Sequence, residues 1–130
     1  MSEPRWLTAD MVKAMHAENL AIFGGSAGVR DEGLLESALG RAQQLYHYGD
    51  DPTLFDLAAA YCAGISGNHP FVDGNKRAAV STARVFLFLN GQRFRPEEAS
   101  IVTVILALAA GEADEVALAA WMERSSTPVG

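Results

Sequence analysis

Residues 67–79 read GNHPFVDGNKRAA, and their polar side chains are of the types that transfer a phosphorus-centred group. His69 has an unperturbed pKa of about 6.5, so it can accept a proton from a hydroxyl at neutral pH. Asp73 supplies one carboxylate of the kind that Mg²⁺ binds together with phosphate oxygens and water. A candidate base and a candidate metal ligand therefore lie within one short loop.

The residues after this carboxylate form a candidate phosphate site. If a helix begins near Gly74, the backbone N–H groups of its first turn have no partner within the helix and carry the positive end of the helix dipole. Gly74 leaves room for a phosphate to approach the backbone, while Asn75, Lys76 and Arg77 add an amide and two positive charges. The segment predicts binding of a nucleotide and transfer of its phosphorus-centred group to a hydroxyl that the histidine deprotonates.

Two familiar nucleotide-binding motifs fit the chain less well. A Walker A loop has Lys directly after its second Gly and a strand before it, whereas Gly74 is followed by Asn75 and preceded by a helical pattern. The glycines of GGSAG, residues 24–28, have no strand before them and are better interpreted as a helix stop than as a dinucleotide fingerprint. A single loop histidine would be unremarkable, so the hypothesis depends on the cluster.

Other residues of the chemically versatile types are expected to be structural. His16 and His47 have no comparable neighbours, and we place them on a helix surface and in a loop. Phe71 is predicted to plug the loop into the core, because a reactive cluster needs rigid support. Trp6 and Trp121 are predicted to pack rather than to stack on a ligand.

Composition predicts one globular domain covering residues 1–130. The 130 residues are 49% hydrophobic and 20% charged, which suits a single core. Cys62 is the only cysteine, which excludes a disulfide framework and cysteine-based zinc sites. No secretion leader or membrane-spanning run is visible, so we expect a cytoplasmic protein with no membrane partner. The net charge of −6 disfavours broad nucleic-acid binding.

Apolar periodicity and capping signals predict an all-α bundle of about six helices, with the reactive loop between two central ones. A tail at residues 125–130 is expected to be flexible. The helices are expected from Ala9 to Phe23, from Asp31 to Leu45, from the Thr53–Asp56 capping box to Gly67, from Gly74 to Asn90–Gly91, from Pro96 to Ala110 and from Glu112 to Arg124.

Several finer expectations follow from the same patterns. Leu7, Met11, Met15 and Ile22 are expected on the apolar side of the first helix, and the nearly all-apolar stretch 101–110 in the centre of the bundle. Pro96 is expected in the first turn of its helix. Residues 46–52 are expected to form a loop, and short strands fit only at 46–48 or 93–95.

The loop HPFVDGNKR, His69 to Arg77, resembles the signature loop of the Fic/Doc family, H-P-F-x-[D/E]-G-N-[G/K]-R. The segment HAENLAIFGGSAGVRDEGLLESALGRAQ resembles the N-terminal half of death-on-curing toxins, so the resemblance covers nearly the whole chain. It implies a single compact Fic-like bundle and the toxin of a type II toxin–antitoxin system.

Two departures from the AMP-transferring members indicate the death-on-curing branch. Those members have Gly after the motif Asn and a second Arg three residues beyond the first, where this chain has Lys76 and Val80. The resemblance then implies a protein kinase that transfers the terminal phosphate of ATP to a threonine of translation elongation factor Tu and halts translation. The roles carried over are the base for His69, the Mg²⁺ ligand for Asp73, and phosphate binding for Gly74, Asn75, Lys76 and Arg77.

The resemblance also implies a partner. The self-inhibitory pattern [S/T]-x-x-x-E-[G/N] does not occur in the chain, so inhibition is expected from a separate antitoxin. Its C-terminal segment would fold as a helix in a groove of the toxin, and contact with DNA would run only through it. Two alternatives stay open: transfer of AMP to a protein hydroxyl, and a non-catalytic module that binds the antitoxin and regulates its operon.

Overall fold

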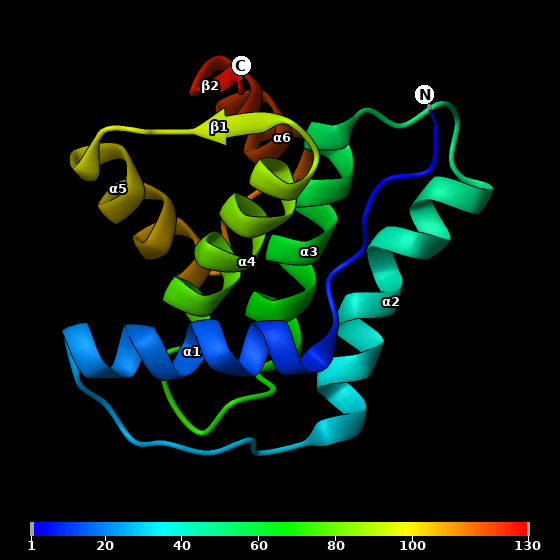
Figure 1. Ribbon diagram of the computed structural model, residues 1–130. Coiled ribbons are helices and arrows are strands. Elements are labelled where there is room, and N and C mark those ends of the chain that lie inside the picture. The colour runs from blue at the N-terminus through cyan, green and yellow to red at the C-terminus, as the bar shows by residue number, and fades with distance from the viewer. Residues whose placement is uncertain (1, 130) are drawn as a thin grey trace.

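Six helices and one two-stranded sheet make up residues 2–129, the part of the chain that this computed structural model describes (Figure 1). The prediction of an all-α bundle is therefore confirmed. Within the described residues, no helix is both long enough and apolar enough to cross a bilayer. The elements are α1 (Ala9–Phe23), α2 (Glu32–Tyr48), α3 (Leu54–Asn68), α4 (Asn75–Leu89), β1 (Gln92–Phe94), α5 (Glu98–Ala109), α6 (Glu115–Arg124) and β2 (Ser126–Pro128).

Helices α3 and α4 form the centre of the bundle and lie side by side (Figure 1). Helices α2 and α6 pack against α3, while α1, α5 and β1 pack against α4. Small residues allow the closest approach: a side chain at Gly64 of α3 would lie 3.1 Å from the carbonyl oxygen of Ala38 in α2. The reactive loop joins the two central helices at one end, beneath α1, as the sequence predicted.

Local capping explains where the helices begin. Thr8 accepts from the N–H of Met11 before α1, and Asp31 accepts from the N–H of Leu34 before α2. The Thr53–Asp56 capping box before α3 is complete. Each cap fills backbone donors that a helix start leaves unpaired, which is why these starts were predicted from neighbouring residues alone.

Two predicted helix ends were wrong by a few residues. Helix α2 continues to Tyr48, into the stretch expected to be a loop, and α3 passes Gly67 to end at Asn68. Space is open around Gly67, and the left-handed residue that ends α3 is His69, with φ of 49°. A non-glycine residue therefore turns the chain out of the helix at the candidate base.

Helix α5 does not occupy the centre, contrary to the prediction for residues 101–110. Of its residues only Ile101 is buried, and Leu106 is 64% exposed. The position between the central helices is already filled, so α5 packs against α4 from outside (Figure 1). Pro96 also lies outside the helix, before the N-cap residue Glu97.

The buried side of α1 agrees with the prediction only in part: Leu7, just before the helix, is buried and Met15 packs against the core, as expected. Val12 and His16, one helical turn apart, face the core, while Met11 is 36% and Ile22 73% exposed. The expectation that His16 is a surface residue was therefore wrong: it is 4% exposed. Because His16 is buried beside Val12, its imidazole needs a hydrogen-bond partner within the protein.

The described part of the tail, residues 125–129, is not free, contrary to the expectation for residues 125–130; residue 130 lies outside the described residues. Ser126–Pro128 pair antiparallel with Gln92–Phe94, and the N–H of Arg95 donates to the carbonyl of Ser125 over 2.9 Å. The possible strand at 93–95 is thus close to β1, whereas residues 46–48 are helical. The strand partners are distant in sequence, so no local pattern marks their pairing.

Cys62 should resist thiol reagents until the chain unfolds. Its side chain is fully buried in α3, and burial raises the pKa of the thiol to about 12, so almost no thiolate exists at neutral pH. We expect no reaction with a disulfide reagent in native buffer and one thiol per chain in denaturant, measured by absorbance. Rapid labelling of the native chain would contradict the buried position.

Candidate active site

The base is held by the backbone around it. His69 has left-handed backbone angles, which cost energy outside glycine, and its N–H donates to the carbonyl of Ile65 over 3.2 Å. The guanidinium of Arg30 donates from Nε to the carbonyl of His69 (2.8 Å) and from Nη2 to that of Asn68 (2.9 Å). Arg30 therefore pairs the carbonyls at the end of α3 and stabilises the turn that presents the imidazole.

The segment before α2 braces the rest of the loop. The carbonyl of Pro70 accepts from the N–H groups of Arg30 (2.7 Å) and Asp31 (3.1 Å), and the N–H of Val72 donates to the carbonyl of Gly28 (3.0 Å). An isolated β-bridge joins Val29 to Phe71. Backbone contacts therefore tie the loop to a segment about forty positions earlier in the chain, in addition to the side-chain bonds of Arg30.

Phe71 anchors the loop in the core, as predicted. It is 1% exposed, and its ring stacks on that of His16 with centroids 3.8 Å apart. Asn75 Oδ1 accepts from the N–H of Phe71, and Asn75 Nδ2 donates to its carbonyl, both over 3.0 Å. The side chain of Asn75, a predicted phosphate ligand, therefore binds the backbone of the loop. Only the backbone N–H of Asn75 is left to bind a phosphate.

Asp73 lies at the turn into α4 and connects three segments. Its carboxylate accepts from the N–H of Gly74 over 2.9 Å and from the N–H of Ser26 over 3.2 Å. Its carbonyl accepts from Nε2 of His16 over 2.7 Å. A side chain at Gly25 would come within 2.9 Å of this carboxylate, so the close approach requires glycine there.

The start of α4 has the features of an anion site. Gly74 is the N-cap, with φ of 76°, and no side chain caps the helix. Among the hydrogen bonds of residues 2–129, none uses the N–H groups of Asn75, Lys76 or Arg77. These donors, at the positive end of the helix dipole, are free to bind phosphate oxygens.

His69 and Lys76 both line a cleft of about 400 Å³ between α3, α4 and the α5–α6 connection. The Nζ atom of Lys76 lies 3.2 Å from Nε2 and 3.4 Å from Nδ1 of His69. Partial desolvation of the ring, followed by the positive charges of Lys76 and Arg30, holds the pKa of His69 below its ordinary value. The imidazole is therefore neutral at pH 7, as a general base must be.

Arg77 is separated from this pair. Its guanidinium carbon lies 3.7 Å from the centroid of the Phe23 ring, a cation–π contact with the end of α1. Arg77 lines a different opening, a groove of about 210 Å³ between α1, α4 and α5. Of the two predicted cationic side chains, Lys76 alone is beside the base.

The residues fit a nucleotide with its metal ion. Residues 2–129 contain no group of three or more His, Cys, Asp or Glu side chains that could enclose a metal ion. An ion at Asp73 would therefore take its other ligands from phosphate oxygens and water, which is how Mg²⁺ is usually held. The unpaired N–H groups of α4 begin at Asn75, two residues beyond this carboxylate.

Two positioning residues were missed from the sequence. His16 holds the carbonyl of Asp73 and the ring of Phe71, and Arg30 holds the carbonyl of His69. The only local signal was the one-turn spacing between Val12 and His16 on a helix face. No local signal marked Arg30, because its acceptors lie 38 and 39 residues away.

Replacing Lys76 with methionine should raise the pKa of His69. The change removes one positive charge that disfavours the imidazolium but leaves the partial desolvation of the ring, so the pKa moves up towards its ordinary value. The imidazole of His69 should therefore become protonated at a higher pH in the variant than in the parent chain. NMR titration of the His69 ring without nucleotide measures this, with Lys13→Met as the matched control. An unchanged or lower pKa would contradict the contact.

Comparison with known proteins identifies one matching family and two similar proteins. A sequence model of the Fic/DOC family matches residues 6–87. The protein kinase doc of Escherichia phage P1 is 35% identical over 101 residues, which cover 77% of this chain and 80% of that protein. The toxin Doc of Mycolicibacterium smegmatis is 49% identical over 71 residues, 53% of this chain and 54% of that protein, so this match spans about half of each.

Proposed function

The chain belongs to the Fic/DOC family, in its death-on-curing branch, and on this premise we propose that it is the toxin of a toxin–antitoxin pair and acts as a protein kinase. It transfers the terminal phosphate of ATP to a threonine of translation elongation factor Tu and thereby arrests translation. The P1 relative is named a protein kinase and the M. smegmatis relative a toxin, which supports both halves of the proposal.

The observation that carries the proposal is the juxtaposition of His69 and Lys76 beside the uncapped start of α4. A neutral imidazole and a cation line one cleft, and the unpaired N–H donors belong to the helix start that carries this cation. Phosphoryl transfer needs little from a protein beyond positioning and stabilisation of charge on the phosphate oxygens. This arrangement supplies both without a protein nucleophile.

In the proposed reaction His69 accepts the proton of the threonine hydroxyl. The hydroxyl oxygen forms a bond to the terminal phosphorus, the bond from that phosphorus to the bridging oxygen breaks, and ADP leaves. Lys76 and the N–H groups of Asn75 and Arg77 bind the charged phosphate oxygens. Asp73 would hold Mg²⁺, which supplies further neutralisation of phosphate charge when bound.

The partner in this proposal is an antitoxin, and the groove between α1, α4 and α5 is where its helix would bind. Ile22 is 73% exposed and Phe23 53% exposed at the rim, and Ile105 lies half-buried on the α5 side. Exposed apolar side chains around a groove suit the apolar face of an amphipathic helix. Because Arg77 lines the groove and also lies in the first turn of α4, a bound helix would sit beside the phosphate site.

The test compares two labels. The purified chain is incubated with elongation factor Tu, Mg²⁺ and ATP labelled on the terminal phosphate or on the α-phosphate, followed by autoradiography. Label only from the terminal phosphate is the expected result. Label from the α-phosphate would mean AMP transfer despite Lys76 and Val80. No label from either would direct the search to another target protein or to the non-catalytic antitoxin-binding role.

A further inference from the structure

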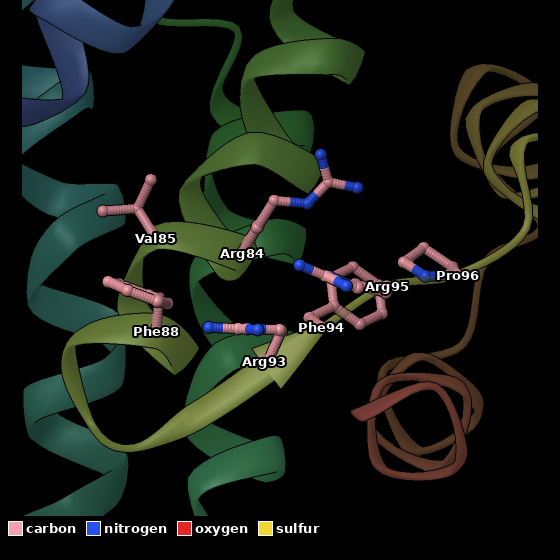
Figure 2. A pocket seen from close by; sticks show the side chains of 7 residues that line it. All are labelled: Arg84, Val85, Phe88, Arg93, Phe94, Arg95 and Pro96. Carbon is pink, nitrogen blue, oxygen red and sulfur yellow. The ribbon is translucent and has the colours of Figure 1, made fainter. Parts of the chain in front are cut away.

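A second cleft, of about 540 Å³, lies on the C-terminal half of α4, away from the active site at its other end. Figure 2 shows three arginine side chains around this cleft. Arg84 comes from α4, Arg93 from β1, and Arg95 directly follows β1. Val85, Phe88, Phe94 and Pro96 complete the lining. We name this set of residues the arginine cleft.

The three guanidinium groups have no acidic partner in residues 2–129. The ion pairs of this part of the chain join Lys13 to Glu32 and Arg41 to Glu115. All three arginines of the cleft are exposed. Like charges that converge without counter-ions produce a local positive potential, even in a chain of net charge −6.

The cleft also has an apolar wall. Phe88 is 54% exposed and Val85 half-buried, while Phe94 is buried with its ring 5.7 Å from the guanidinium carbon of Arg84. A ligand in the cleft would therefore meet planar cations and apolar surface together. That combination suits a segment in which acidic and apolar side chains alternate, since guanidinium groups bind carboxylates through paired hydrogen bonds.

Arg84 connects this cleft with the groove assigned above to the antitoxin helix. It lines both openings, so one extended partner chain can contact both. We propose that the arginine cleft binds an acidic, carboxylate-rich peptide segment that continues from the partner helix in the groove. The identity of that partner rests on the proposed function, whereas the acidic character of the segment rests on the cleft itself.

A nucleic acid is the less suitable ligand. It draws its affinity from many neutralised phosphates, and this cleft offers three cations in a chain with 16 acidic residues. Glu97 and Glu98 follow directly after the lining residue Pro96 and would repel an extended phosphate backbone. Glu98 also lines the groove, so the acidic side chains of the partner belong to the part of the segment that lies in the arginine cleft.

The experiment uses a fluorescein-labelled peptide of alternating Glu and Leu, and a matched peptide of Gln and Leu, in fluorescence anisotropy with the full chain. Only the Glu peptide should bind. Arg93→Gln with Arg95→Gln should weaken binding by about tenfold, from two exposed charge contacts. Arg5→Gln with Arg124→Gln changes the net charge equally at exposed sites outside the cleft, and should alter affinity by less than about twofold.

NMR and competition distinguish the possible outcomes. The Glu peptide should shift amide signals of β1 and the second half of α4. The proposal would be overturned if both double variants lost the same amount of peptide affinity, or if the peptide shifted only the amide signals of Lys76 and Arg77. It would also be overturned if oligo-dT bound more tightly than the Glu peptide and this binding depended on the arginines. Self-association of the chain that the Arg93 and Arg95 changes abolish would overturn it too, because a second copy would then fill the cleft.

The binding assay needs no ATP, so it is independent of the kinase proposal. Peptide binding without phosphate transfer would remove the proposed function and leave the arginine cleft as a peptide site. Phosphate transfer without peptide binding would support the proposed function and overturn the proposal for the arginine cleft. Thermal unfolding of each double variant should match that of the parent chain, since the exchanged side chains make no hydrogen bond or ion pair with other described residues.

Discussion

Replacing His69 with alanine is expected to slow phosphate transfer by about 100- to 10,000-fold, the usual contribution of a positioned general base. The imidazole is the neutral base beside Lys76, and the loop offers no second histidine. The side chain is exposed, so its removal should leave the fold unchanged. The measurement is the initial rate of terminal-phosphate incorporation into elongation factor Tu at saturating ATP.

A matched control for this variant is His47→Ala. His47 is exposed in the last turn of α2, and its ring lies beside those of the neighbouring residues Tyr46 and Tyr48. Its rate should stay within about twofold of the parent chain. Transfer by His69→Ala at the parental rate would remove the base assignment. A slow His69→Ala variant that also unfolds at lower temperature would not support it, since loop damage would then explain the loss.

Replacing Asn75 with alanine is expected to lower the free energy of unfolding by about 2–4 kcal/mol. The amide satisfies both the N–H and the carbonyl of the buried Phe71, and alanine would leave those two groups without partners. The loop that carries His69 would lose its attachment to α4. Urea unfolding followed by circular dichroism measures the change.

Asn19→Ala is the control for this prediction. Asn19 donates a single hydrogen bond, to Ser81, at a partly buried position, so its loss should cost about 1 kcal/mol. If Asn75 acted only as a phosphate ligand, its removal would raise the KM for ATP and leave unfolding unchanged. A large loss of stability identifies the side chain as a brace of the loop, with phosphate contact left to the backbone.

The brace explains how an exposed histidine can be well positioned. Phe71 fills the core below the loop, Asn75 pairs with its backbone, and Arg30 holds the carbonyl of His69 from outside. These contacts come from α1, α4 and the segment before α2. Preorganisation by a supporting shell is what keeps a catalytic group within the narrow range of productive geometry.

The sequence by itself determined the features that depend on neighbouring residues. The Thr8, Asp31 and Thr53 caps each bond to an N–H three residues on, so a short window contains the whole interaction. The reactive loop is similar: from His69 to Arg77 the candidate base, metal ligand and phosphate site are contiguous, and their residue types are visible without a fold.

Only the tertiary structure decided which side chains meet. It buried His16, brought Arg30 to His69 and separated Arg77 from Lys76. It also placed α5 outside the pair of central helices. The sequence could not predict this position, because helix periodicity describes which faces are apolar but not which helix fills the centre. The arginine cleft and the pairing of β1 with β2 have the same origin, since their residues come together through contacts that no short window of sequence contains.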